Sequence, residues 1–269
     1  MWYDKSIDCQ TTESLSNKRN EVIHLRNILK EGSAELGVSL SERQLDQLES
    51  YAKILVEWNE KMNLTAITEP GEIAVKHFLD CLAPIPTGLI RKKVIDVGTG
   101  AGFPGLVLKI ACPDISLTLL DSLNKRIRFL QAAAEELDIR DNIRFVHARA
   151  EDAARQERAV YDTAVSRAVA NLAALSEFCL PFLKIGGYFI ALKGPAAEEE
   201  VESAKRAIYI LGGEVQEVLT CRIPFSELSH KLVVIKKVRQ TPSQYPRKAG
   251  IPTKTPIDTC YNLKKGAGK

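Results

Sequence analysis

The sequence predicts an α/β domain with a Rossmann-like, mostly parallel sheet that has one antiparallel strand, helices on both faces and an N-terminal helical extension. Three observations support this. A glycine-rich turn follows a short apolar run at residues 94–105, strand-like runs then alternate with helical patterns, and two final strand-like runs have no helix between them. Alternation is typical of parallel βαβ units, whereas strands joined by a short loop usually pair antiparallel.

Length and composition agree with this class. The chain has 269 residues, of which 45% are hydrophobic and 26% charged, and its net charge of +3 is too small to indicate a partner. There is no apolar run long enough to cross a bilayer and no signal-peptide pattern, so we expect a cytoplasmic protein with no membrane partner. Six cysteines without metal-ligand spacing predict reduced thiols and no metal. We expect a monomer.

The first part of the chain is predicted to be helical. Residues 1–20 are polar and balanced in charge, and we expect them to be poorly ordered. Residues 21–90 form a helical lead-in to a single domain spanning residues 21–239. Its strongest amphipathic helix opens with the capping box S-E-R-Q at residues 41–44, and a shorter helix is expected from about Glu72 to Leu82.

The α/β core is expected at residues 91–239. Its predicted strands lie at residues 94–96, 115–121, 143–148, 161–168, 187–193, 214–223 and 230–238. Its predicted helices lie at residues 104–111, 124–137, 172–180 and 196–210. Ser122 is suited to cap the second of these helices.

The turn V-I-D-V-G-T-G-A-G-F-P-G at residues 94–105 is the strongest sign of a ligand site. Glycines at 98, 100 and 102 allow positive φ and a close approach of the backbone to a ligand. The free N–H groups at the start of the next helix attract an anionic group. A tight turn without a ligand is the alternative, and three glycines in five residues argue against it.

Two classes of ligand fit this turn. Gly100 to Gly105 match G-x-G-x-x-G, and Asp121 follows at the spacing of the dinucleotide fingerprint, so a nicotinamide-dependent oxidoreductase stays open. With Asp96 two residues ahead of Gly98, the longer pattern resembles the glycine motif of S-adenosylmethionine-dependent methyltransferases. In those enzymes the turn lies under the methionine end of the cofactor, and an acid in the position of Asp121 binds the ribose hydroxyls.

Other candidates follow the later strands, because ligands of an open parallel sheet bind beyond the carboxyl ends of its strands. Residues 149–152 follow the third strand, and Glu151 there has the alternative role of stabilising a helix dipole. Arg167 ends an apolar strand and needs a partner for its charge. His77 and His230 are each interpreted as structural.

The segment after the fourth strand narrows the reaction. Methyltransferases that modify amino groups typically carry Asn/Asp-Pro-Pro-aromatic there, whereas this chain has S-R-A-V at residues 166–169. A pyrimidine C5 methyltransferase needs a nucleophilic cysteine, and neither the fourth nor the fifth strand ends with one. An acceptor with an available lone pair is the remaining class.

Several segments together resemble one family, the bacterial small-subunit ribosomal RNA guanine-N7 methyltransferases, also called glucose-inhibited division protein B. The matching segments include V-E-W-N-E-K-M-N-L-T-A-I-T at 56–68, K-H-F-L-D-C at 76–81, I-D-V-G-T-G-A-G-F-P-G at 95–105, L-D-S-L-N-K-R at 120–126, R-A-E-D at 149–152, S-R-A-V-A at 166–170, A-L-K-G at 191–194 and Y-P-R-K-A-G-I-P-T-K-T-P-I at 245–257.

The resemblance implies S-adenosylmethionine as cofactor and, as substrate, a guanine N7 of 16S ribosomal RNA or the small ribosomal subunit, near the decoding site. By motif, Gly98 and Phe103 flank the cofactor, Ala150 and Glu151 border its adenine, and Arg167 reaches the site. We include Gly100, in the same turn, among the cofactor-binding residues. A non-catalytic RNA-binding module stays open as a third function.

The end of the chain, residues 240–269, is predicted to be a separate basic tail. It contains six Lys or Arg residues against one Asp, and four prolines. Such a segment is too polar to form a core of its own. An arm that contacts RNA phosphates and a solvated tail are equally good interpretations.

Overall fold

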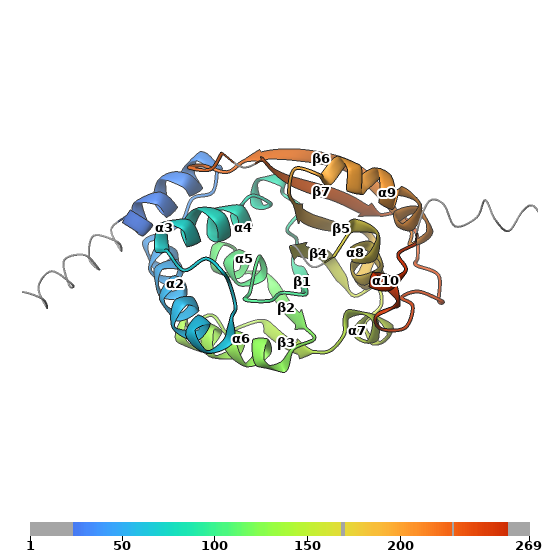
Figure 1. The fold of residues 1–269 in the computed structure, drawn as a ribbon, viewed down its shortest axis with the longest axis horizontal. Helices are drawn as coiled ribbons and strands as arrows, with labels where there is room; N and C mark the ends of the chain where they lie inside the picture. The colour runs from blue at the N-terminus through green and yellow to red at the C-terminus, as the bar shows by residue number, and fades with distance from the viewer. Residues whose placement is uncertain (1–23, 168–169, 228, 258–269) are drawn as a thin grey trace, which may run out of the picture.

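The computed structural model describes residues 24–167, 170–227 and 229–257. The segment 1–20 and residues 258–269 of the predicted tail lie outside the described residues. The described chain is built around a seven-stranded sheet (Figure 1). The strands are β1 (Lys93–Val97), β2 (Ser116–Asp121), β3 (Ile143–His147), β4 (Tyr161–Arg167), β5 (Leu183–Lys193), β6 (Gly213–Arg222) and β7 (Ser229–Lys237).

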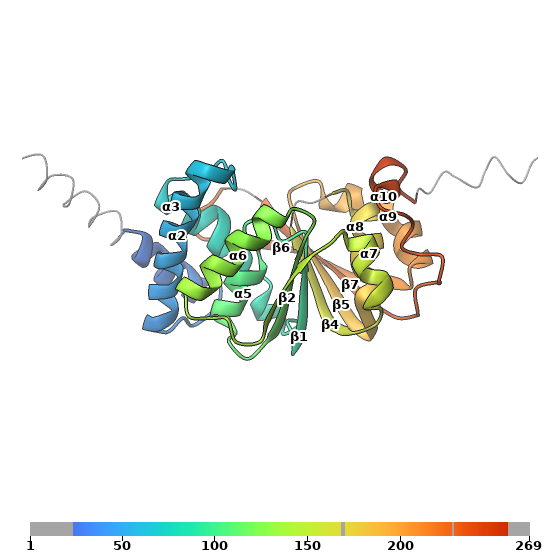
Figure 2. The ribbon, with the colours of Figure 1, turned by 90° about the horizontal axis from the view of Figure 1, so that it is seen from below.

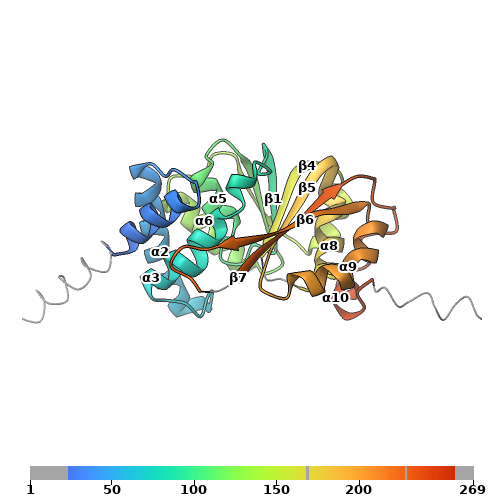
Figure 3. The same cartoon turned by 90° about the horizontal axis from the view of Figure 1, so that it is seen from above.

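The order of the strands confirms the predicted fold class. It is β3-β2-β1-β4-β5-β7-β6, and β1 pairs in parallel with both β2 and β4. β7 runs antiparallel to β5 and to β6, and forms the expected hairpin with β6 (Figure 3). The strand order therefore reverses between β1 and β4, which is where open α/β sheets bind their ligands.

Helices cover both faces of the sheet (Figure 2). One face carries α5 (Gly105–Ala111) and α6 (Asn124–Glu136) together with the lead-in, and the other carries α7 (Ala150–Gln156), α8 (Leu172–Cys179) and α9 (Ala197–Ile210). Alternate strand residues serve the two layers. Val94 belongs to the core under α5 and α6, and its neighbour Ile95 belongs to the core under α8 and α9. This alternation follows from the two-residue period of a strand.

The lead-in consists of a helix at residues 24–35, α2 (Glu42–Met62), and a nearly continuous helical stretch at residues 70–82. The capping box predicted at Ser41 is present, with Gln44 bonded to it in both directions. The stretch is made of α3 (Pro70–Ile73), a π-helical part at Ala74–Leu79 and α4 (Asp80–Leu82). π-helical turns are frequent at functional sites, and this one carries His77.

Two expectations differ from the structure. Ser122 does not cap α6; instead the carboxylate of Asp121 accepts a hydrogen bond from the backbone N–H of Leu123, at 2.9 Å. The described part of the basic tail also lies against the domain, because Arg158 donates to the carbonyls of Thr241 and Tyr245 at 2.6 and 2.5 Å. Apolar packing adds to these hydrogen bonds, because Tyr245 and Ile257 pack against the core under α8 and α9.

Candidate functional site

A cavity of about 490 Å³ opens at the carboxyl ends of β1, β2 and β4, at the point where the strand order reverses. Its lining brings together the residues predicted from the sequence, which come from four separate segments of the chain. These residues are Gly98, Gly100, Phe103, Asp121, Ala150, Glu151 and Arg167. Their assignment to a cofactor is taken up below, but their convergence on one cavity is a feature of the fold.

The glycines of the turn serve different purposes. Gly98 and Gly100 have φ of 73° and 61° and line the cavity. An added Cβ at Gly100 would have no atom nearer than 3.9 Å, whereas one at Gly102 would lie 2.4 Å from the hydroxyl of Tyr51 and one at Gly105 would lie 2.5 Å from Leu119. Packing against the domain thus requires the last two glycines, and the first two leave bare backbone facing the cavity.

Asp96, the acid that distinguishes the turn, supports it from below. Its side chain is fully buried, and Oδ2 accepts a hydrogen bond of 2.8 Å from the backbone N–H of Gly105. Burial raises the pKa of this carboxyl to about 7. Asp96 therefore fixes the start of α5 against β1 and lies beneath the turn, outside the cavity lining.

Asp121 links the glycine turn to the start of α6. It is 3% exposed, and Oδ2 accepts from the backbone N–H of Gly100 at 3.0 Å and from Arg126 Nη1 at 3.3 Å. Oδ1 accepts from Leu123 N, so the carboxylate has three partners. A carboxylate has roughly four acceptor positions, and Asp121 retains capacity to accept from a ligand hydroxyl in the cavity.

Arg167 lies at the carboxyl end of β4, as predicted, and its charge has a buried partner. Nη1 lies 3.1 Å from Asp80 Oδ2 and 3.2 Å from the carbonyl oxygen of Lys76. The guanidinium carbon also lies 4.8 Å from the ring centroid of Phe103. Asp80 in turn contacts His230 Nδ1 at 2.9 Å. The lead-in and β7 therefore hold Arg167 at the cavity wall.

His77 completes this cluster and lines the cavity. Its ring lies 4.6 Å from that of Phe103, Nδ1 lies 3.2 Å from Arg167 Nη2, and Nε2 lies 2.8 Å from Thr65 Oγ1. Burial and the charge of Arg167 lower the pKa of His77 to about 4. Nδ1 also lies 3.1 Å from the carbonyl oxygen of Lys76. Arginine only donates and a carbonyl oxygen only accepts, so the two neighbours of Nδ1 favour opposite tautomers of the neutral ring.

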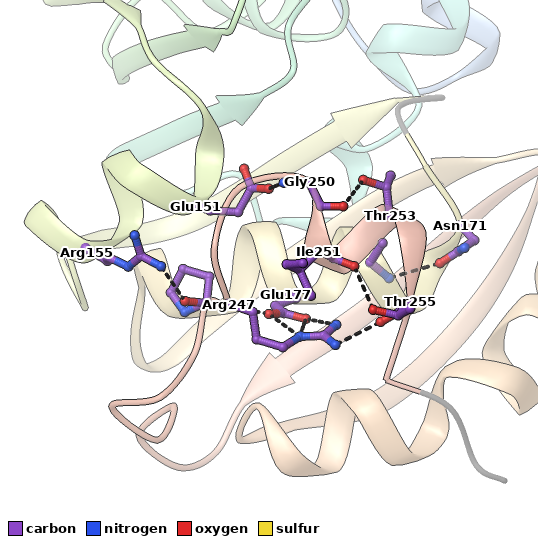
Figure 4. A network of polar contacts seen from close by, with 11 residues as sticks. Glu151, Arg155, Asn171, Glu177, Arg247, Gly250, Ile251, Thr253 and Thr255 are labelled. Carbon is purple, nitrogen blue, oxygen red and sulfur yellow. Dashed lines mark hydrogen bonds and ion pairs between the residues drawn. The ribbon is translucent and has the colours of Figure 1, made fainter. Parts of the chain in front are cut away.

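Glu151 lies in the first turn of α7 and is 4% exposed. Its Oε1 accepts a hydrogen bond of 2.8 Å from the backbone N–H of Gly250, which belongs to the C-terminal segment (Figure 4). Gly250 and Thr253 also line the cavity. The segment predicted to be a separate tail therefore forms part of the cavity wall, next to residues 150 and 151.

Comparison with known proteins identifies the family. A family model described as rRNA small subunit methyltransferase G matches residues 44–229. The chain belongs to the rRNA small subunit methyltransferase G family.

Curated members of the rRNA small subunit methyltransferase G family match across nearly their whole length. The protein of Alkaliphilus oremlandii is 54% identical over 239 residues, which cover 87% of this chain and 100% of that protein. The protein of Alkaliphilus metalliredigens is 53% identical over 234 residues, covering 86% and 98%. A Clostridium botulinum protein is 50% identical over 235 residues, also covering 86% and 98%. All three are named ribosomal RNA small subunit methyltransferase G, and the resemblance predicted from motifs is confirmed.

Sequence reasoning missed several lining residues of this methyltransferase G family member. His77 was interpreted as an isolated structural residue, and Thr65, Arg126, Gly250 and Thr253 were not selected as site residues, yet all line the cavity. A signal was available for all of them, because they lie in the segments 56–68, 76–81, 120–126 and 245–257, which carry the family resemblance. What the sequence lacks is the fold that brings these segments to the sheet edge.

The described residues of this methyltransferase G family member, 24–167, 170–227 and 229–257, contain neither a membrane-spanning helix nor a cluster of metal ligands. No helix among them combines the length and apolar character needed to cross a membrane. Within the same residues, His, Cys, Asp and Glu side chains form no group of three or more that is placed to hold a metal ion.

Proposed function

We propose that this protein transfers a methyl group from S-adenosylmethionine to N7 of a guanine in 16S ribosomal RNA, near the decoding site. Membership of the rRNA small subunit methyltransferase G family supports the class of reaction and substrate. The observation that carries the proposal is that the glycine turn, Asp121, Glu151 and Arg167 surround one cavity where the strand order reverses.

The donor set of the cavity fits this cofactor. Gly98 and Gly100 present bare backbone, Asp121 retains acceptor capacity for ribose hydroxyls, and Ala150 and Glu151 lie beyond β3, where the family motif places the adenine. When bound, S-adenosylmethionine supplies a methyl group on a positively charged sulfur. Phe103 offers an apolar ring at the cavity wall.

Arg167 is proposed to position the reactants. Asp80 and the carbonyl of Lys76 fix its guanidinium over Phe103, so a positive charge stands at the cavity wall where an anionic group of either reactant can pair with it. A bidentate hydrogen bond from Arg167 to guanine O6 and N7 is excluded, because a donor on N7 would occupy the lone pair that must attack the methyl group. We expect Arg167 to bond a carboxylate, a phosphate or O6 alone.

The proposed reaction needs no general base. Guanine N7 has an in-plane lone pair and no proton to lose, so the protein has mainly to hold donor and acceptor in line. Positioning of this kind is worth roughly 7–11 kcal/mol. The neutral ring of His77, bonded to Arg167 and Thr65, is proposed to keep Arg167 and Phe103 in place.

The RNA is proposed to approach over the basic rim of the cavity. Arg126 and Arg149 line the cavity, and the Arg149 side chain is exposed. Lysine and arginine side chains bind phosphates without regard to sequence. We further propose that the protein works as a cytoplasmic monomer on 16S RNA or the small ribosomal subunit.

Methyl transfer from labelled S-adenosylmethionine to two transcripts tests the proposal. The transcripts carry 16S sequence with either guanine or 7-deazaguanine, and assembled small subunits lacking the modification serve as a third substrate. We expect label in guanine RNA or subunits and none in 7-deazaguanine RNA. Equal labelling of both transcripts would place the methyl group on another atom. Calorimetric binding of NAD in place of S-adenosylmethionine would favour an oxidoreductase, and cofactor binding without transfer to any substrate would favour an RNA-binding module.

A further inference from the structure

The C-terminal segment at residues 247–255 lies beside Glu151 and Glu177 (Figure 4). It follows β7, passes α7 and α8, and contains the short helix α10 (Ile251–Lys254). Two of its residues, Gly250 and Thr253, line the cavity. The segment lies beyond residues 44–229, the part of the chain that the family model matches.

One guanidinium closes the base of this segment. Arg247 Nη2 lies 2.7 Å from Glu177 Oε2, and Nε lies 3.0 Å from both carboxylate oxygens. Arg247 Nη1 donates to the carbonyl of Thr255 at 2.8 Å. The Glu177 side chain, on α8, is fully buried. Arg247 therefore joins the two ends of the segment to each other and to a buried anion, with the planar geometry that favours strong bonds.

The tip of the segment contacts the residue expected beside the adenine. Gly250 has φ of 82°, a left-handed conformation that turns the chain toward α7, and its N–H donates to Glu151 Oε1 at 2.8 Å. Thr253 lies on the same side, one turn further on. Arg247 contacts Thr255, eight positions further along the chain, so residues 247–255 form a closed loop with Gly250 at its tip. The contacts of Arg247 close this loop and thereby hold its tip against Glu151.

The approach to the segment is anchored separately. Arg158 donates to the carbonyls of Thr241 and Tyr245, and Arg155 donates to the carbonyl of Pro246 at 3.3 Å. Loss of the Arg247 side-chain contacts therefore loosens the loop, which keeps backbone hydrogen bonds from Arg247 N to Glu177 Oε1, at 2.7 Å, and from Gly250 N to Glu151 Oε1. The preceding residues stay attached to Arg155 and Arg158.

We propose that residues 247–255 form a wall of the cofactor site, and that Arg247 and Glu177 are positioning residues that set the affinity for the nucleoside end of the cofactor. This inference rests on the proposed use of S-adenosylmethionine. Because coupling between a ligand and a conformation is reciprocal, the bound cofactor must also hold the segment closed.

The affinity of four variants for S-adenosylmethionine tests whether residues 247–255 form a wall of the cofactor site. Arg247→Met removes the closure, and the double variant Glu177→Gln/Arg247→Met removes it without leaving a buried unpaired carboxylate. Arg247→Lys keeps the charge but loses the planar fork. Lys248→Met is the matched control, since it removes one exposed cation from the same segment. Calorimetry measures the Kd for S-adenosylmethionine, and circular dichroism checks the fold.

We expect the three closure variants to bind S-adenosylmethionine roughly 10- to 100-fold more weakly, the loss that corresponds to a charged hydrogen bond. The Lys248→Met control should stay within about twofold of wild type, a range that corresponds to well under one tenfold step in Kd. At saturating cofactor, kcat and the KM for RNA should be unchanged in the closure variants. A purely structural role would lower stability without this selective rise in the cofactor KM.

Limited trypsin digestion of the wild type provides a readout that needs no variant. Cleavage after Lys254 should slow in the presence of S-adenosylmethionine, because the cofactor holds the segment closed. An equal rate of cleavage with and without S-adenosylmethionine would overturn the proposal that residues 247–255 form a wall of the cofactor site. Equal cofactor affinity in the wild type and in folded closure variants would overturn it as well. No binding of S-adenosylmethionine by the wild type would instead overturn the proposed function and the wall together.

Discussion

The buried ion pair between Asp80 and Arg167 permits a quantitative prediction. Their side chains are 9% and 16% exposed, and their charged atoms lie 3.1 Å apart. Asp80→Asn preserves the shape and one oxygen acceptor for Arg167, and His230 can change tautomer to accept from the new amide. The variant therefore removes the negative charge and little else. Breaking a buried pair in this way costs about 3–5 kcal/mol, because the remaining charge is left without a counter-ion.

Urea unfolding of Asp80→Asn, Arg167→Met and the double variant measures this cost. We expect each single change to lower the free energy of unfolding by about 3–5 kcal/mol. The double variant should lose less than the sum, by about 2 kcal/mol or more, because the two residues are in contact. Arg43→Met is the control: it breaks an ion pair with Asp138 whose side chains are 70% and 92% exposed, and it should cost no more than about 1 kcal/mol. A loss below 1 kcal/mol for Asp80→Asn, or full additivity, would refute the reasoning.

Three further predictions concern residues in or next to the cavity where the strand order reverses. His77 has a pKa of about 4 in the folded protein against 6.5 in the unfolded chain, so the unfolded chain binds more protons between these pH values. The free energy of unfolding of the wild type should therefore fall by about 3 kcal/mol as the pH falls from 6.5 to 4, relative to that of His77→Gln. Parallel curves of unfolding free energy against pH for the two proteins would contradict this. Gly102→Ala should destabilise the protein by more than Gly37→Ala, since both have positive φ but only Gly102 places the new Cβ against a neighbour; equal losses in urea unfolding would show that the turn yields. Asp121→Asn should weaken S-adenosylmethionine by about 10- to 100-fold in calorimetry, and an unchanged Kd would remove Asp121 from the cofactor site.

Most of the fold could be predicted from local sequence patterns. The period of the strands, the capping box at Ser41 and the spacing of the glycines are short-range signals, and the structure confirms the order of elements that they predict. Residues after the strands could be collected into one candidate site, since parallel strands end at the same edge of a sheet. Arg167 was recognised as needing a partner because a charged side chain closed an apolar strand.

Long-range partners could not be predicted in the same way. Nothing near Arg167 in sequence shows that Asp80 and His230 complete its surroundings, because those contacts depend on how the lead-in packs against β7. The role of the tail was predicted from its composition, which is an average over its residues and does not show where any one of them binds. The placement of the tail depends on distant partners, namely Arg155 and Arg158, at and just after the end of α7, and the buried Glu177 of α8 that Arg247 contacts.

The contact between Asp80 and His230 has a consequence for how the molecule folds. The two residues are 150 positions apart in the chain, and β7, which carries His230, is inserted between β5 and β6 after both have been synthesised. Closing so long a loop is entropically costly, and proteins rich in distant contacts fold slowly. We therefore expect the surroundings of Arg167 to be among the last parts to form, so that a chain with most of its helices and strands in place is still inactive until the final hairpin docks.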